Sequence, residues 1–318
     1  MAHRYTARKR QALTAWLMLL LAGGIGPCAS ALAEHSVLVL SGRDNPAYHQ
    51  VTASFQAFLQ DEVGGLKFVS VTLDGDDATR QTQLEALQEQ GVTLVFALGS
   101  RATKLATERF TTVPVVSSMV LSRAEIQALP NVTGVALEFP LATQLRWMRR
   151  LLPQANRIGV LFDPALNQVW VDAARREADK EGLVLVSIPV NNARELPAGL
   201  KKLARAADVL WAIPDKTVYS GKTLKQVLLS SFRSRIPVVG LSGAWVKAGA
   251  FYALDRDYQD LGRQNGVIAK KLLAGAAPGK VTPETPSEAV YSLNLKTARH
   301  MKTTIGDEFL TGAVKVYE

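Results

Sequence analysis

Residues 93–100 read TLVFALGS, and residues 157–164 read RIGVLFDP. In each stretch an uninterrupted apolar run ends abruptly in small or polar residues. Such a run is typical of a strand buried on both faces of a parallel sheet, because a strand with one face in water would alternate apolar and polar residues. Both stretches are therefore predicted to be central strands of α/β sheets.

Similar runs lie on both sides of the first stretch. They are Val37 to Leu40, Lys67 to Leu73, Val113 to Val116 and Asn131 to Leu137. Apolar residues at helical spacing separate them, as at Val51, Phe55 and Leu59. This alternation of strand and helix predicts a doubly wound parallel sheet.

The alternation of strand and helix starts again after Phe139-Pro140 and a predicted helix that ends at Pro153. The runs of this second series are residues 157–162, 183–188, 209–213 and 236–241. The remaining residues offer one more helix (258–273) and short strands, too little for a third unit. The expected fold class is α/β, with two Rossmann-like lobes whose parallel sheets are joined by a multi-crossing hinge. We place residues 34–137 and 251–285 in the first lobe, and residues 138–250 and 286–318 in the second.

The N-terminus resembles a secretion signal. A basic segment around Arg8 precedes the apolar run Ala12 to Ala22, and Ala31-Leu32-Ala33 has the small-x-small pattern of a signal-peptidase site. A retained anchor is the alternative, although the run is shorter than the roughly 20 residues of a comfortable membrane span. Cleavage after Ala33 predicts an exported, periplasmic protein. It also removes Cys28, the only cysteine, and with it disulfides and thiol chemistry.

Composition excludes several classes of protein. The chain is 47% hydrophobic and 20% charged, with a mean hydropathy of +0.06, which argues against both disorder and a multi-span membrane protein. The formal net charge of +9 falls to +5 once the four basic residues of the signal are removed. No Lys/Arg block remains to bind a nucleic-acid backbone. We therefore expect no nucleic acid as a partner.

Motifs for catalysis, metal binding and cofactors are not recognisable. His35, His49 and His300 are scattered, and none has a second ligand at metal-binding spacing. No nucleophile elbow, phosphate-binding loop or dinucleotide fingerprint follows a predicted strand. The acidic pairs Asp76-Asp77 and Asp255/Asp257 are read as turn and capping residues. We therefore predict no catalytic residue, no metal site and no cofactor.

Polar residues instead recur at the carboxyl ends of the predicted strands. Ligands of open parallel sheets bind there, where loops and helix N-termini converge. The candidate ligand-binding residues are Ser41, Arg43, Gly99, Ser100, Arg101, Ser117 and Ser118 in the first lobe, and Asp163, Asn167, Asn191, Asp215, Lys216 and Ser242 in the second. Trp211 and Trp245 flank strand ends, and packing in the core is favoured over stacking on a ligand.

Several ordered stretches together resemble the ABC-transporter substrate-binding proteins of the tryptophan and aromatic-amino-acid-binding type. They are residues 131–135 (NVTGV), 139–140, 144–153, 157–164 with Asn167, 214–218 (PDKTV), 246–250 (VKAGA), 257–266 and 294–298. The resemblance implies a type I periplasmic-binding-protein fold with three crossings. It also implies a small-molecule ligand held between the lobes, delivery to an inner-membrane ABC permease, and a monomer.

Departures from the family pattern bear on the ligand. The family usually has Gly-Thr-Pro-Ala where this chain has residues 99–102 (GSRA), and Asp-Asn where it has Asp215-Lys216. Ser122, Leu137 and Ser242 or Gly243 stand where the family commonly has acids. Fewer acids and two added cations predict a carboxylate-bearing or otherwise anionic ligand. A sensor subunit of a membrane receptor or kinase and an exported α/β enzyme remain open alternatives.

Overall fold

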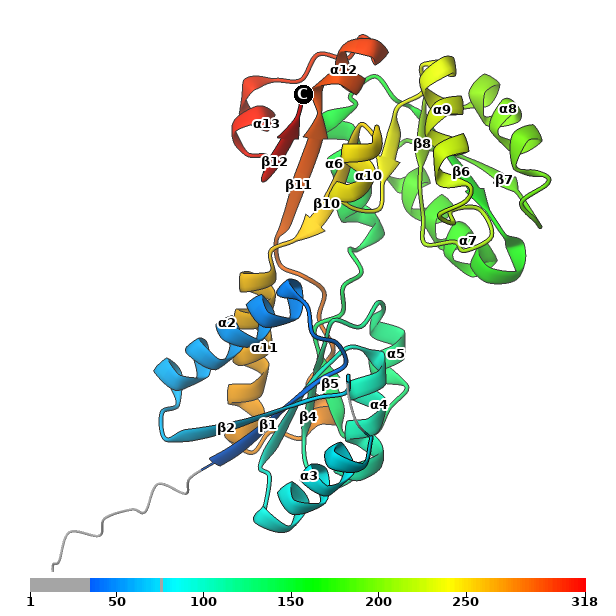
Figure 1. The fold of residues 1–318 in the computed structure, drawn as a ribbon. Helices are drawn as coiled ribbons and strands as arrows, with labels where there is room; N and C mark the ends of the chain where they lie inside the picture. The colour runs from blue at the N-terminus through cyan, green and yellow to red at the C-terminus, as the bar shows by residue number, and fades with distance from the viewer. Residues whose placement is uncertain (1–34, 75–76) are drawn as a thin grey trace, which may run out of the picture. The chain divides into compact units, whose positions relative to one another are not determined.

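The structure is a computed structural model that describes residues 35–74 and 77–318. The predicted signal peptide lies outside the described residues. Within them, no helix is both long and apolar enough to span a membrane. Two separate sheets are present (Figure 1).

The first sheet has five parallel strands in the order β2-β1-β3-β4-β5. The strands are β1 (His35–Ser41), β2 (Leu66–Thr72), β3 (Leu94–Leu98), β4 (Val115–Ser118) and β5 (Val132–Gly134). Every residue of β3 is buried, as the apolar run at residues 94–98 predicted.

Helices cover both faces of this sheet (Figure 1). On one face α2 (Pro46–Glu62) and α11 (Tyr258–Leu273) pack against Val37 and Val39 of β1. On the other face α3 (Asp77–Gln90), α4 (Ser100–Arg109) and α5 (Arg123–Gln127) pack against Leu38 and Leu40. Successive strand residues point to opposite faces, so a continuous apolar run supplies both cores.

Helix α11 packs closely on α2. A Cβ at Gly262 would lie 2.4 Å from the backbone oxygen of Val51, and one at Gly266 would lie 2.5 Å from the ring of Phe58. Only glycine allows this approach of the two helices. The helix belongs to the first sheet by packing, although it follows a strand of the second sheet in the sequence.

The second sheet has seven strands in the order β12-β11-β10-β9-β8-β6-β7. They are β6 (Arg157–Phe162), β7 (Val184–Pro189), β8 (Val209–Trp211), β9 (Val238–Gly240), β10 (Tyr252–Arg256), β11 (Ala289–Asn294) and β12 (Lys315–Tyr317). Strands β10 and β11 are antiparallel, and every other pair is parallel.

Two apolar clusters flank this sheet. One contains residues of α6 (Leu141–Leu151) and α7 (Pro164–Lys180), and the other contains residues of α8 (Leu196–Ala206) and α9 (Leu224–Ser234). Four short helices complete the described chain: α10 (Gly243–Ala248), α12 (Leu295–Met301), α13 (Asp307–Thr311) and the 3-10 turn η1 (Pro278–Lys280).

Sheet membership differs from the expected lobe boundary at one place. Residues 251–285 were assigned to the first lobe, yet β10 pairs with β9 and β11 of the second sheet. The chain therefore passes between sheets three times, near residues 135–140, at 257 and at 281–288. The third passage is tied to the first where Ala136 N donates to Glu284 O at 3.0 Å and Glu284 N donates to Gly134 O at 2.8 Å.

Candidate functional site

The carboxyl edge of the first sheet is organised around Gly99, between β3 and α4. Its φ is +89°, and a Cβ there would lie 2.7 Å from the hydroxyl oxygen of Tyr48. Its amide donates to Ser118 O at 2.7 Å. Both the backbone conformation and the nearby tyrosine therefore require glycine at this position.

Helix α4 begins directly after Gly99 and has no side-chain cap. The amides of its first turn, from Ser100 and Arg101 onward, have no partner within the helix. Such an N-terminus carries the positive end of the helix dipole and can hold a carboxylate. Gly99 and Ser100 thus lie where the sequence predicted an anion-binding edge.

The side chain of Arg101 takes a different direction from the one expected. It lines a hollow between α3 and α4 together with Lys104 and Glu108 of its own helix. These residues share one flank of α4, since they follow one another at helical spacing. At the helix N-terminus, Arg101 therefore contributes its backbone amide, while its guanidinium lies on the flank.

Tyr48 is a candidate that the sequence reasoning did not include. It lies in the first turn of α2, capped by Asn45, whose Oδ1 accepts from Tyr48 N at 3.1 Å. Burial raises the pKa of its hydroxyl, Arg43 lowers this pKa, and Asp74 raises it. The net pKa is raised, so the hydroxyl stays protonated beside Gly99 and can donate a hydrogen bond. The one signal in the sequence is the Asn-Pro helix start two residues before it.

Three predicted serines of the first lobe form hydrogen bonds within the protein, and two of them are buried. Ser41 Oγ donates to Arg43 O at 2.6 Å. Ser117 and Ser118 are fully buried: Ser117 Oγ lies 2.7 Å from Thr103 Oγ1, and Ser118 Oγ accepts from Asn265 Nδ2 at 3.1 Å. The two buried serines join α4 and α11 to the end of β4.

In the second lobe, Asp215 connects two loops. Its Oδ2 accepts from Asp163 N at 2.7 Å and from Asn167 Nδ2 at 2.9 Å, and its Oδ1 accepts from Thr217 N and Val218 N, both at 2.9 Å. Asp215 is 5% exposed. A carboxylate has about four lone-pair sites, so the four N–H donors saturate it.

Asp163 completes this network. Its Oδ1 caps α7 by accepting from Ala165 N at 2.9 Å, and its Oδ2 accepts from Thr217 Oγ1 at 2.7 Å. The structure thus brings together three predicted residues, Asp163, Asn167 and Asp215, and adds Thr217. All of them lie at the carboxyl ends of the adjacent strands β6 and β8.

The other candidates of this lobe lie apart from the network. Asn191 follows the edge strand β7 and is held by Glu195, whose Oε2 accepts from the Asn191 amide and side chain at 3.0 Å each. Hydrogen bonds from the Asn191 backbone and side chain lower the pKa of Glu195 against the opposing effect of burial, and a hydrogen bond from Asn192 lowers it further. Ser242 precedes α10 without capping it through its side chain. Lys216 is exposed and has no ion-pair partner among residues 35–74 and 77–318.

Trp211 is part of the core, as the sequence predicted when packing was favoured over stacking on a ligand. It is 1% exposed, packs edge-on against Trp170 with ring centroids 4.9 Å apart, and its Nε1 donates to Gln144 Oε1 at 3.3 Å. Trp245 is partly buried and packs edge-on against Tyr219 at 5.5 Å. Both tryptophans stabilise the second lobe.

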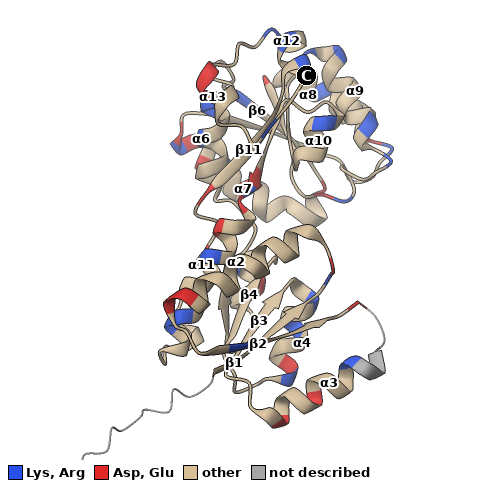
Figure 2. Cartoon of the chain, turned by 60° about the vertical axis from the view of Figure 1, so that its left-hand side comes forward, with Lys and Arg blue, Asp and Glu red and all other residues tan. Residues whose placement is uncertain are grey.

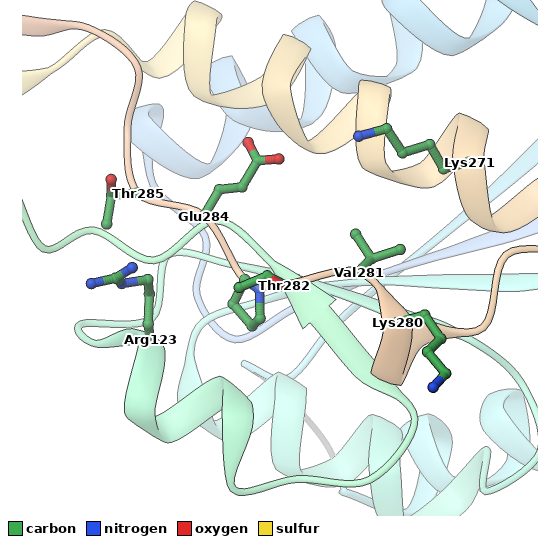
Figure 3. A pocket seen from close by; sticks show the side chains of 8 residues that line it. Arg123, Lys271, Lys280, Val281, Thr282, Glu284 and Thr285 are labelled. Carbon is green, nitrogen blue, oxygen red and sulfur yellow. The ribbon is translucent and has the colours of Figure 1, made fainter.

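A hollow of about 610 Å³ lies along the third passage between the sheets. Arg123 of α5, Lys271 of α11 and Glu284 line it, and Figure 3 shows Glu284 directed toward α11 while Lys280 points away. Arg123 is already paired with Glu138 at 3.0 Å. Opposite charges in this hollow do not favour a ligand of either sign. In the described part of the chain, no three His, Cys, Asp or Glu side chains are placed to hold a metal ion.

Comparison with known proteins decides the family. The profile of the ABC transporter substrate binding proteins matches residues 44–317, which is most of the chain. The chain belongs to this family. The lobes and strand-end loops described above are therefore those of a substrate-binding protein.

Individual relatives of this substrate-binding protein are distant. A tyrosine-binding protein of Clostridioides difficile is 22% identical over 215 residues, which are 65% of this chain and 62% of that protein. A structure from Streptococcus pneumoniae in complex with L-Trp is 22% identical with a TM-score of 0.58, covering 89% of this chain and all of that one. The ligand-free, open structure of CD0873 from Clostridium difficile is 19% identical with a TM-score of 0.75, covering 89% and 99%. At these identities the structures show a shared fold.

Proposed function

We propose that this substrate-binding protein binds a small carboxylate-bearing molecule between its two lobes for an ABC import system. Family membership supports the solute-binding role. The proposal on the ligand rests on one observation: α4 starts at Gly99 without a side-chain cap, beside the hydroxyl of the partly buried Tyr48. Amide donors and a protonated phenol together suit a carboxylate.

The second lobe supports the same ligand class. Asp215, the acid that matches the family pattern, is saturated by four N–H donors of its own lobe. It has no remaining lone pair for an ammonium group. The next residue, Lys216, is an exposed cation. Recognition of a carboxylate is therefore favoured over recognition of an amino group.

Comparison with the family pattern indicates that residue 101 supplies a backbone donor. A proline there, as the resemblance implies for relatives, lacks an N–H, whereas Arg101 supplies one in the first turn of α4. The chain thus has one more backbone donor at the proposed site. Arg101→Ala would keep that amide and remove the guanidinium, and Arg101→Pro would remove both.

Titration calorimetry with the Arg101 variants tests the proposal. The ligand panel compares aromatic and branched amino acids with organic acids that lack an amino group. We expect an organic acid to bind most tightly, Arg101→Pro to weaken binding more than Arg101→Ala, and Lys104→Ala, further along the same helix, to change nothing. Tryptophan that binds more tightly than every organic acid of the panel, and equally tightly in Arg101→Pro and Lys216→Ala, would overturn the proposed ligand class.

We further propose that the protein is exported, cleaved after Ala33, and works as a monomer with an inner-membrane permease. The signal-like N-terminus and the family both support export. The mass of the protein recovered from the periplasm tests cleavage. A protein that begins at Met1 would contradict it.

A further inference from the structure

The basic excess of the chain is concentrated in one stretch of the second lobe. Residues 196–235 contain eight Lys and Arg but only two Asp. In residues 34–318 outside this stretch, 25 basic residues stand against 26 acidic ones. The net charge predicted for the mature chain therefore comes from α8, α9 and their loops.

Five of these basic residues line a groove between α8 and α9. It has a volume of about 710 Å³ and is lined by Lys201 and Arg205 on the α8 side and by Lys222, Lys225 and Arg233 on the α9 side. No acidic residue lines it. Figure 2 shows the blue segments of Lys and Arg over α9.

The cations of the groove are unpaired. None of the five forms an ion pair within residues 35–74 and 77–318. The two acids of the stretch are occupied elsewhere, since Asp208 pairs with Arg157 at 2.7 Å and Asp215 accepts its four N–H donors. Like charges on two facing helices repel one another, so an acidic partner would relieve this repulsion.

Apolar residues also line the groove. Leu200, Ala204 and Leu229 line it between the basic side chains, and Leu229 is 46% exposed. A smaller hollow shares Leu200 and Ala204 and continues inward to Leu203, Leu210 and Ile236. The groove thus combines apolar lining residues with a basic wall on each side.

We propose that this groove docks an acidic amphipathic segment of a partner protein. Apolar side chains of the segment lie on Leu200 and Leu229, and its Asp or Glu side chains meet Lys201 and Arg205 on one wall and Lys225 on the other. The concave form favours an inserted segment over a membrane. A planar anionic surface would touch the rim and leave the apolar lining residues uncovered.

Fluorescence anisotropy with a labelled peptide tests the docking, using protein purified after expression of the full chain. The probe is a helical peptide of Glu, Leu and Ala, about 18 residues or five turns long, with Leu on one face and Glu on both flanks. We expect saturable binding that weakens as salt rises. Lys201→Gln/Arg205→Gln/Lys225→Gln should weaken binding by roughly tenfold, and Leu229→Glu should weaken it as well.

A matched control removes the same charge elsewhere. Lys67, Lys296 and Lys315 are exposed and lie outside the groove, so Lys67→Gln/Lys296→Gln/Lys315→Gln should leave peptide binding unchanged. Near-identical thermal unfolding of all variants would show that the fold is retained. Equal weakening in the control, equal binding of a scrambled peptide, or binding only to phosphatidylglycerol vesicles would each overturn the proposal.

Discussion

Arg256 Nε donates a hydrogen bond to the backbone oxygen of Leu137 at 2.7 Å. Its guanidinium also lies 4.7 Å from the ring centroid of Phe139. Burial lowers the pKa of Arg256, and the nearby Asp255 and Tyr258 raise it in part. One side chain thus ties the end of β10 to the first passage between the sheets.

Replacing Arg256 tests this tie. Arg256→Met leaves the Leu137 oxygen without its donor, and a loss of about 1–3 kcal/mol in the free energy of unfolding is expected. Arg256→Lys should cost less, because an ammonium can still donate and still lie over Phe139. Urea unfolding measures both, and an Arg256→Met protein as stable as wild type would contradict the assigned role.

The saturated carboxylate of Asp215 leads to a second prediction. Asp215→Asn replaces one acceptor oxygen by an N–H₂ group that faces donors, so we expect a loss of about 2–3 kcal/mol in unfolding free energy. Asp172→Asn is the control, because Asp172 forms an exposed pair with Arg175 at 3.5 Å and should cost less than about 1 kcal/mol. Equal effects of the two substitutions would argue against the network.

The contact between Gly99 and Tyr48 leads to a third prediction. Gly99→Ala combines a left-handed backbone with a Cβ 2.7 Å from the hydroxyl, and we expect it to cost more than about 1 kcal/mol. Tyr48→Phe in the same chain removes the clashing oxygen and should recover part of the loss. Gly221→Ala, where a Cβ meets nothing within 4 Å, is the control. A strictly additive double variant would show that the two residues do not interact.

The pH dependence of stability should change on replacement of Asp208. Burial, the largest single influence, raises the pKa of Asp208. Hydrogen bonds from the side chain and backbone of Arg157 and from Asn156 N, together with the Arg157 charge, leave this pKa lowered overall.

A lowered pKa in the folded state adds stability above the unfolded value of about 3.9, and this stability is lost as the pH falls through the folded value. Asp208→Asn should therefore be less stable than wild type at pH 7, by about 1 kcal/mol or less for a partly exposed pair. The difference should shrink below about pH 4. Urea unfolding at several pH values measures it, and a difference that grows on acidification would contradict the sign.

Much of the fold could be predicted from short patterns. The continuous run at residues 94–98 became β3, and the run at residues 157–162 became β6 and ends at Asp163, which the structure shows as the cap of α7. The sheet that contains β10 could not be predicted, because an apolar run looks the same in either sheet and only its pairing with β9 and β11 decides.

The candidate site could be predicted less completely. The order of strands and loops was enough to place Asp163, Asn167 and Asp215 at one edge. That Asp215 is saturated depends on donors 48 and 52 residues away in the chain. Ser118 looked available at the end of β4, but it is buried, and Asn265 of α11, 147 residues later, donates a hydrogen bond to it.

The position of α11 has a consequence for the order in which the chain can fold. Residues 35–134 are synthesised first and contain all five strands of the first sheet. The face that carries Val37 and Phe96 is completed only when Leu261 and Ile268 arrive, after five helices and five strands of the second lobe have left the ribosome. The first lobe, although its strands are made first, should therefore keep an apolar surface exposed until α11 emerges, and a chaperone could bind that surface in the meantime.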